Sequence, residues 1–265
     1  MKSNYVKHAL AAGEPQIGTW LSLASLYATR YIARSGLHWY TVDMEHSAAN
    51  WNDAAAMFGA IAEAGAVPLC RIPGNTVENV KRALDCGAFG IVFPMVNSKE
   101  EAELCVSACK YPPVGVRSIG GGLHALNFGC APGEYYKKAN DEILIIIQAE
   151  HVLAVERCEE ILSVPGIDAV FIGPNDLLSS MHKTPAMETD DPQFVAALKH
   201  IRETAVKCGV APGLHTANAE MAKRRIAEGW KFVAVGSELA FMMDGVKPVA
   251  EICKGNSGGE GVSRY

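Results

Sequence analysis

The feature of this chain that most constrains its fold is a regular alternation of strand-like and helix-like segments. Each short apolar run is followed by a segment whose apolar residues have helical spacing, and several of the helical segments end at a glycine. The expected strands are Ile17–Leu21, Trp39–Asp43, Val67–Arg71, Gly90–Phe93, Ile143–Gln148, Ala169–Ile172, Gly213–His215 and Phe232–Val235. The expected helices are Leu26–Arg34, Trp51–Ala64, Val77–Asp85, Lys99–Cys109, Val152–Leu162, Pro192–Cys208, Ala219–Ala227 and Ser237–Ile252.

Strands that alternate with helices indicate a parallel sheet. The eight units predict a single closed (β/α)8 TIM barrel of the α/β class, a fold that commonly needs ~250 residues. An open doubly wound sheet is the alternative, but it usually has a glycine-rich phosphate turn after its first strand, and none follows Ile17–Leu21. We expect the barrel over residues 1–254 and a flexible, Gly- and Ser-rich tail over residues 255–265.

Composition excludes several classes of partner. The chain has 265 residues and a net charge of −5, with no basic block that would suggest nucleic acid. Its apolar runs are much shorter than the ~20 residues that span a bilayer, and its N-terminus lacks the apolar region of a signal peptide. The eight cysteines include no CxxC pair. We therefore expect a cytoplasmic protein that binds neither membranes nor nucleic acid.

One connection, from Lys110 to Asp141, is much longer than the others and contains Gly120-Gly121-Gly122. A long loop on the strand-end face of a barrel is often a lid or a substrate loop, and we expect that role here. Tyr135 and Tyr136 are candidates for contact with a substrate, although packing is their plainer role.

Two acidic residues indicate a metal site. Glu150 ends the apolar run that begins at Ile143, and Asp176 follows the run Ala169–Ile172. Buried strands exclude charge unless it is paired or bound to a metal. Carboxylates at the ends of successive strands therefore suggest a divalent cation held by oxygen ligands.

Other polar residues also fall at strand ends, where barrel active sites gather. They are Trp20, Asp43, Glu45, His46, Arg71, Gln148, His215 and Ser237. His46 is a plausible general base, because a neighbouring carboxylate can orient its ring. Arg71 is suited to stabilising an oxyanion, and its alternative role is a buried ionic network with Glu150 and Asp176. His215 is expected to lie in the core or behind the site.

No lysine falls inside an expected strand. This argues against an aldolase of the Schiff-base type, which needs a desolvated lysine within the barrel.

Together these segments resemble the HpcH/HpaI aldolase family, the class II, metal-dependent pyruvate aldolases, which includes macrophomate synthase-like fungal enzymes. The matching motifs follow the family's order over roughly residues 15–250. They are Gly18-Thr19-Trp20, Asp43-Met44-Glu45-His46, Arg71, Phe93-Pro94-Met95-Val96, Tyr111-Pro112-Pro113, Gly115-Val116-Arg117, Gln148-Ala149-Glu150, Phe171-Ile172-Gly173-Pro174-Asn175-Asp176-Leu177 and Val233-Ala234-Val235-Gly236.

The resemblance implies a homohexamer built as a trimer of dimers. It also implies that Glu150 and Asp176 bind Mg²⁺, Mn²⁺ or Co²⁺, which pyruvate or oxaloacetate would chelate. His46 would act as the base, and Arg71 would contact the keto or enolate oxygen. Asp85 matches an acid that a neighbouring subunit contributes near the histidine.

The resemblance further implies a substrate-binding set. Gly173, Pro174 and Asn175 would hold the carboxylate of the keto acid, with Asn175 the expected backbone donor because Pro174 has no N–H. Gln148 and Trp20 belong to the same set, although packing is the plainer role of Trp20.

The chain departs from the bacterial aldolases in one stretch. Where they carry arginine and serine after the motif at Gly115-Val116-Arg117, this chain reads from Gly120 to Phe128 without either. That stretch shapes the acceptor pocket in the family, so the aldehyde partner stays open.

The first hypothesis is a lyase that forms a pyruvate enolate, cleaves 4-hydroxy-2-oxo acids and decarboxylates oxaloacetate. The alternatives are a biosynthetic enzyme like macrophomate synthase, which couples oxaloacetate decarboxylation to C–C bond formation, and a barrel that binds a ligand without turnover.

Overall fold

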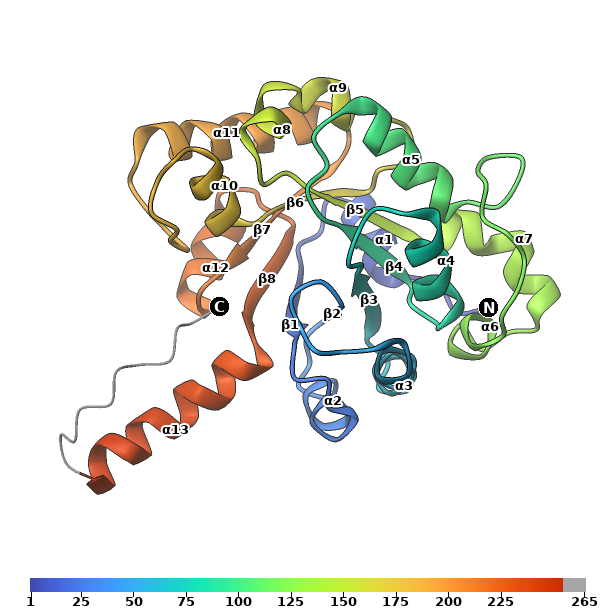
Figure 1. Ribbon diagram of the computed structural model, residues 1–265, viewed down its shortest axis with the longest axis horizontal. Coiled ribbons are helices and arrows are strands. Elements are labelled where there is room, and N and C mark those ends of the chain that lie inside the picture. Colours follow the sequence, from blue (N-terminus) through green and yellow to red (C-terminus); the bar gives the residue numbers. More distant parts are fainter. Residues whose placement is uncertain (255–265) are drawn as a thin grey trace.

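The computed structural model describes residues 1–254, which form a closed barrel of eight parallel strands in sequence order (Figure 1). Strand β8 pairs with β1 and closes the barrel, with Gln16 in register with Phe232. All eight expected strands, and the (β/α)8 fold with them, are confirmed. The strands are β1 (Gln16–Leu21), β2 (Trp39–Asp43), β3 (Val67–Arg71), β4 (Gly90–Phe93), β5 (Leu144–Gln148), β6 (Ala169–Ile172), β7 (Ala211–Thr216) and β8 (Phe232–Ser237).

Helices cover the outside of the barrel. The expected helix Val152–Leu162 is divided in two, because Arg157 leaves the helical region with φ −101° and ψ 17°. The sequence analysis did not foresee α1, α6, α7 or α10. The described helices are α1 (Tyr5–Ala11), α2 (Leu26–Ile32), α3 (Trp51–Glu63), α4 (Val77–Asp85), α5 (Lys99–Cys109), α6 (Leu123–Asn127), α7 (Pro132–Glu142), α8 (Val152–Glu156), α9 (Cys158–Leu162), α10 (Pro174–Ser180), α11 (Pro192–Lys207), α12 (Ala219–Ala227) and α13 (Glu238–Lys254).

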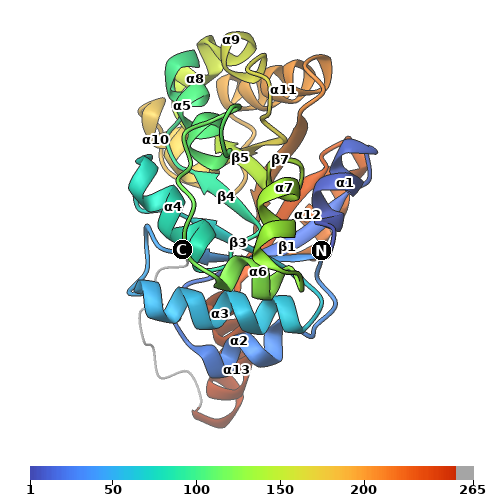
Figure 2. The ribbon, with the colours of Figure 1, turned by 90° about the vertical axis from the view of Figure 1, so that its right-hand side faces the viewer.

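The long connection before β5 is not a lid over the strand ends of its own barrel. It contains α6 and α7 and leads into the first residue of β5, which places it at the N-terminal end of the barrel (Figure 2). Phe128 stacks on Phe89 with ring centroids 3.6 Å apart, and Asn127 donates a hydrogen bond to the Gly87 carbonyl at 3.0 Å. The expected lid role was therefore wrong for the single chain, because a helix-to-strand connection reaches the opposite end of a parallel barrel.

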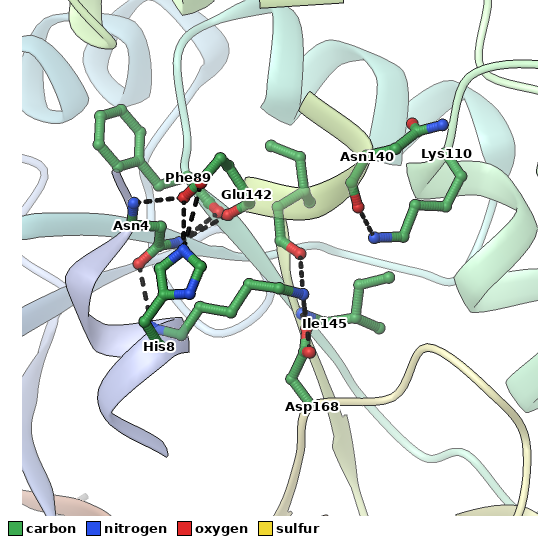
Figure 3. A network of polar contacts seen from close by, with 10 residues as sticks. Asn4, His8, Phe89, Lys110, Asn140, Glu142, Ile145 and Asp168 are labelled. Atoms are coloured by element: carbon green, nitrogen blue, oxygen red, sulfur yellow. Dashed lines mark hydrogen bonds and ion pairs between the residues drawn. The ribbon is translucent and has the colours of Figure 1, made fainter. Parts of the chain in front are cut away.

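Helix α1 is attached to the same end of the barrel by polar contacts (Figure 3). The Lys7 ammonium donates to both carboxylate oxygens of Asp168 at 2.7 Å and to the Ile143 carbonyl at 3.0 Å. Asp168 in turn accepts the N–H of Ile145 at 2.8 Å. One lysine on α1 therefore joins the starts of β5 and β6.

A close aromatic contact needs a glycine in β1. Trp39 stacks on Phe232 with ring centroids 4.3 Å apart. A Cβ at Gly18 would lie 2.1 Å from the Trp39 ring, so only glycine leaves room for it.

Near the other end of the strands, His215 lies in an aromatic cluster with Trp20 and Phe171, whose ring centroids are 6.1 and 6.4 Å from its own. Its Nε2 donates to the Gly236 carbonyl at 3.0 Å. Burial lowers the pKa of His215 to about 4, and the positive charge of Arg71 adds to this effect. The imidazole is therefore neutral in the folded protein at neutral pH.

Helix α13 extends away from the barrel (Figure 1), and large apolar side chains along it are exposed, including Met242, Val246 and Ile252. The expected tail over residues 255–265 lies outside the described residues. Within the part of the chain that is described, no helix has the length and apolar character needed to cross a membrane.

We expect Lys7→Met to lower the free energy of unfolding by about 1–3 kcal/mol, because it leaves the mostly buried Asp168 carboxylate without its cation. Urea unfolding followed by circular dichroism measures the change. Lys199→Met, which breaks an exposed pair with Glu203 on α11, is the control and should change the value by less than about 0.5 kcal/mol. Equally small changes in both variants would contradict the role given to Lys7.

His215 makes stability depend on pH. The unfolded chain protonates this histidine near pH ~6.5, while the folded protein holds its pKa at about 4. Between these values the unfolded state binds more protons, so stability falls as the pH falls through this range and is fully present above it. Between about pH 7 and pH 5 the wild type should lose up to about 2 kcal/mol more than His215→Gln. Parallel pH profiles of unfolding for the two proteins would refute this assignment.

Candidate active site

A cavity of about 850 Å³ lies at the C-terminal ends of the strands. Residues from most of the strand ends line it together with the start of α10 and of α13. The lining consists of Trp20, Ser22, Asp43, His46, Arg71, Gln148, Glu150, Phe171, Gly173, Pro174, Asn175, Asp176, Ser179, Pro185, Met187, His215, Ser237 and Leu239. The structure therefore brings together the predicted catalytic, substrate-binding and metal-binding residues except Asp85, and the further candidates Glu45, Tyr135 and Tyr136 do not line the cavity.

Glu150 lies two residues after the end of β5, and each of its carboxylate oxygens accepts a hydrogen bond. Oε1 accepts the N–H of Met95 at 2.9 Å, and Oε2 accepts the side-chain amide of Gln148 at 2.9 Å. The residue is only 3% exposed. Burial raises the pKa of Glu150 to about 7, with a further contribution from the negative charge of Asp176.

Gly173 brings the two acids together. It precedes α10, whose first turn carries Asp176. A Cβ at Gly173 would lie 2.6 Å from Oε2 of Glu150 and 3.7 Å from Oδ2 of Asp176, so both carboxylates face the space beside this glycine.

This pair fits a hard divalent cation. The Oε1 atom of Gln148 is buried beside Glu150 without a hydrogen-bond partner, which leaves another oxygen acceptor near the two carboxylates. Among residues 1–254, no group of three or more His, Cys, Asp or Glu side chains is placed to hold a metal. The protein would thus supply two carboxylates and leave the other positions to substrate and water oxygens, an arrangement that Mg²⁺ commonly adopts.

Arg71, at the end of β3, pairs with Asp43 at the end of β2. Its Nε donates to Oδ1 of Asp43 at 2.9 Å and its Nη2 to Oδ2 at 2.6 Å. Burial alone would raise the pKa of Asp43, but the hydrogen bonds and charge of Arg71 lower it overall. The guanidinium also lies 4.6 Å from the centre of the Trp20 ring. Arg71 is therefore fixed by Asp43 and Trp20, and Nη1 takes no part in the bidentate pair.

His46 lies in the loop after β2. Its backbone N–H donates to Oδ1 of Asp43 at 3.2 Å, so the carboxylate that orients Arg71 also shapes this loop. The imidazole is 67% exposed, and its Nε2 lies 3.8 Å from Oε2 of Glu45. An exposed ring at the edge of a cavity is accessible to a substrate hydroxyl group and can accept its proton.

Asp85 lies elsewhere. It is the last residue of α4 and pairs with Nη2 of Arg117 at 2.9 Å. Tyr135, a candidate for acceptor contact, is fully buried and accepts a hydrogen bond from Nη1 of the same arginine at 2.9 Å. A single chain does not bring Asp85 near His46, and its role in a neighbouring subunit stays a prediction.

The sequence analysis missed part of the cavity wall. Ser179, Pro185 and Met187 come from α10 and the segment after it, which were expected as loop. Leu239 comes from the first turn of α13. Among these residues, only Ser22 could have been assigned to the cavity from the sequence, because it directly follows β1 and strand ends line the cavity.

The family model "HpcH/HpaI aldolase/citrate lyase" matches residues 16–244. A 4-hydroxy-2-oxo-heptane-1,7-dioate aldolase of Klebsiella pneumoniae is 36% identical over 94% of this chain and 93% of its own length. A hydroxypyruvate/pyruvate aldolase of Deinococcus radiodurans is 35% identical over 96% of this chain and 91% of its own.

Solved structures agree with this match. An HpcH/HpaI aldolase from Desulfitobacterium hafniense superposes with a TM-score of 0.84 at 33% identity, covering 92% of this chain and 96% of its own. Macrophomate synthase, at 23% identity and a TM-score of 0.81 over 96% of this chain and 90% of its own, shows the shared fold alone. With a family model spanning most of the sequence and aldolases matched over nearly their whole length, this chain belongs to the HpcH/HpaI aldolase/citrate lyase family and is a carbon–carbon lyase of the class II aldolase type.

Proposed function

We propose that this enzyme uses a divalent cation to cleave 4-hydroxy-2-oxo acids into pyruvate and an aldehyde, and that it also decarboxylates oxaloacetate. The observation that carries the proposal is the convergence of Glu150 and Asp176 on the space beside Gly173. The names of the relatives, which are aldolases for 2-oxo acids, support the same substrate class.

Glu150 and Asp176 would hold the cation, with Mg²⁺, Mn²⁺ and Co²⁺ all suited to oxygen ligands. When bound, such an ion supplies a Lewis acid that favours negative charge on the keto oxygen of the substrate. Gln148 holds Glu150 in its orientation through the amide hydrogen bond.

Arg71 stabilises the same developing charge from the protein side. Its guanidinium is oriented by Asp43 and stacked over Trp20 before any substrate binds. A fixed donor stabilises charge that appears in the transition state without the cost of reorganising. Asn175, at the start of α10, would donate its backbone N–H to the carboxylate of the keto acid.

His46 would take the proton from the 4-hydroxyl group. As that O–H loses its proton, the C3–C4 bond breaks, the aldehyde leaves and the electron pair moves onto the keto oxygen. Protonation at C3 then gives pyruvate. Loss of CO₂ from oxaloacetate reaches the same enolate without a hydroxyl deprotonation.

We further propose a homohexamer, a trimer of dimers, in which Asp85 of one subunit approaches His46 of the next. The exposed apolar side chains of α13 support self-association, since large apolar patches commonly mark protein interfaces.

We infer a cytoplasmic location. All eight cysteines are free, as is usual where reducing conditions are maintained.

Glu150→Gln should weaken Mn²⁺ binding by at least about 100-fold, because it removes one of two anionic ligands and keeps the side-chain volume. Mn²⁺ titration followed by electron paramagnetic resonance measures the affinity. Glu45→Gln removes a nearby carboxylate that does not line the cavity and is the matched control. Unchanged Mn²⁺ affinity in Glu150→Gln would disprove the metal role.

His46→Ala should lower retro-aldol turnover by about 10²–10⁴-fold, the range typical of a lost general base. Oxaloacetate decarboxylation should fall less, because it needs no proton from a hydroxyl group. The two rates are measured with the same Mg²⁺-loaded protein by coupled pyruvate detection. Equal losses in both reactions would contradict the assigned role.

A further inference from the structure

A second cluster of buried polar side chains lies beneath the long connection, at the N-terminal end of the barrel. Arg117 and His124 are 1% and 0% exposed, and Tyr135 is fully buried beside them. None of the three lines the strand-end cavity, and the proposed reaction uses none of them. Their polarity in the interior therefore needs an explanation of its own.

Arg117 is held by an acid and by aromatic rings. Its Nη1 donates to the Tyr135 hydroxyl and its Nη2 to Oδ1 of Asp85, both at 2.9 Å. The guanidinium also lies 4.5 Å from the centre of the Tyr111 ring. Asp85, at the end of α4, therefore already shares its charge with this arginine.

His124 lies beside the same ion pair without a hydrogen bond of its own. Its ring centroid is 4.2 Å from that of Tyr135 and 5.8 Å from that of Tyr136, and neither ring nitrogen has a hydrogen-bond partner in the described chain. A phenyl ring would fill this space without leaving polar atoms unsatisfied. An imidazole placed here at a cost in stability points to the property that sets it apart, the gain of a proton near neutral pH.

The groups that face His124 favour its uncharged form. Burial lowers the pKa of His124, and the positive charge of Arg117 lowers it further. Asp85 acts in the opposite direction, through its carboxylate and its nearby backbone carbonyl, but does not reverse the shift. Tyr135 and Tyr136 of α7 face the ring as phenol groups. Helix α3 also packs on α6, but none of its described residues contributes a charge that acts on this histidine.

A loop of three glycines, Gly120 to Gly122, covers Asp85 and His124. A Cβ at Gly121 would lie 3.0 Å from Cβ of Asp85 and 3.4 Å from Cε1 of His124, and the φ of Gly121 is +73°. Glycine adopts this conformation readily and leaves room for the close approach. The loop therefore rests directly on the acid of the ion pair and on the histidine.

Little else holds this loop in place. Residues 118–121 make no hydrogen bond with other residues of the described chain. Helix α6, which follows, has five residues and no side-chain cap at its N-terminus. Segments with few hydrogen bonds open at a small cost in free energy. Packing on Asp85 and His124 therefore decides whether the loop stays closed.

We propose that the loop Gly120–Gly122 and helix α6 form an acid-sensitive latch, which uncharged His124 holds closed over Asp85 and Arg117 and which protonation of His124 opens. A protonated ring would be a second buried cation beside Arg117, and Asp85 is already paired. Movement of the ring into water relieves this charge, and α6 and the loop move with it because His124 belongs to α6.

The latch gives Asp85 an environment that depends on pH. While the latch is closed, Arg117 and the glycine loop fix this carboxylate, which is 23% exposed. Opening removes the loop from its surface, so a residue proposed to approach His46 of the next subunit would lose its fixed position in acid. This consequence rests on the proposed function, whereas the latch itself does not.

Hydrogen–deuterium exchange of the full-length protein tests the latch without reference to activity. The open state takes up a proton near the ordinary histidine pKa of ~6.5, which the closed state resists, so opening becomes easier as the pH falls. After correction for the intrinsic rate, exchange over residues 118–127 should rise by about three- to tenfold between about pH 7.5 and pH 5.5. Peptides from β5 report opening of the barrel and should not follow this rise.

His124→Gln keeps a polar side chain that cannot gain a proton. Its exchange over residues 118–127 should change by less than about twofold across the same pH range, whatever its starting rate. His200→Gln removes an exposed histidine of α11 and should keep the wild-type rise. A flat profile in the wild type, or an equal rise in His124→Gln, overturns the inference.

The glycine loop provides a second test. Gly121→Ala should speed exchange over residues 118–127 at neutral pH by about tenfold or more, because the added Cβ meets Asp85 and strains a positive φ. Gly122→Ala adds the same methyl group where nothing lies within 4 Å, and it is the matched control. Equal exchange in the two variants would show that the loop does not rest on Asp85 and His124, and would overturn the latch.

Discussion

The site depends on one carboxylate that is kept almost free of water at the end of a barrel strand. Glu150 is 3% exposed, and burial raises its pKa to about 7. The chain offsets this unfavourable burial with the N–H of Met95 and the amide of Gln148. Met95 adopts a φ of +51°, which residues other than glycine seldom occupy, so backbone strain accompanies the aiming of that N–H. Such strain persists only where the surrounding structure requires it, and here it orients a candidate metal ligand.

The positive charge in the cavity belongs to a residue that is already paired. Arg71 gives two of its donors to Asp43 and rests on Trp20. Its charge is therefore largely balanced before a substrate arrives, while Glu150 and Asp176 have no cation of their own among the described side chains that line the cavity. A keto acid whose oxygen gains negative charge needs more positive charge than this guanidinium supplies. A dication bound at the carboxylates of Glu150 and Asp176 would supply it. Structure and electrostatics thus argue for the metal on the same residues.

Local sequence pattern was enough to predict the strands and the acids at their ends. The eight strands are short apolar runs bounded by turn residues, and Glu150 and Asp176 could be assigned to strand ends from their position after these runs. The helix over Pro174–Ser180 was missed because its residues fall within a motif that resembles a turn, and proline at the first position of a helix is hard to distinguish from a turn proline. The segment before β5 was misplaced for a different reason. Its Gly- and Pro-rich composition indicates a loop, but which end of the barrel a loop reaches depends on whether it comes after a strand or after a helix.

Part of the cavity wall could not be found from the sequence, because its members share no motif and meet only in the closed barrel. Ser22 comes directly after the first strand, and Leu239 lies at the start of the last helix, more than 200 residues later. They become neighbours of one cavity because β8 pairs with β1 and because Glu238 bonds the backbone of the β1 turn. Barrel closure therefore does more than complete the sheet, because it joins the first and last units of the chain in one wall of the cavity. A change in the position of α13 would reach that surface directly, since Leu239 lies in its first turn and Glu238 carries the link to Ser22. Glu150 and Asp176 follow β5 and β6 instead, so the acidic side of the cavity does not depend on this link.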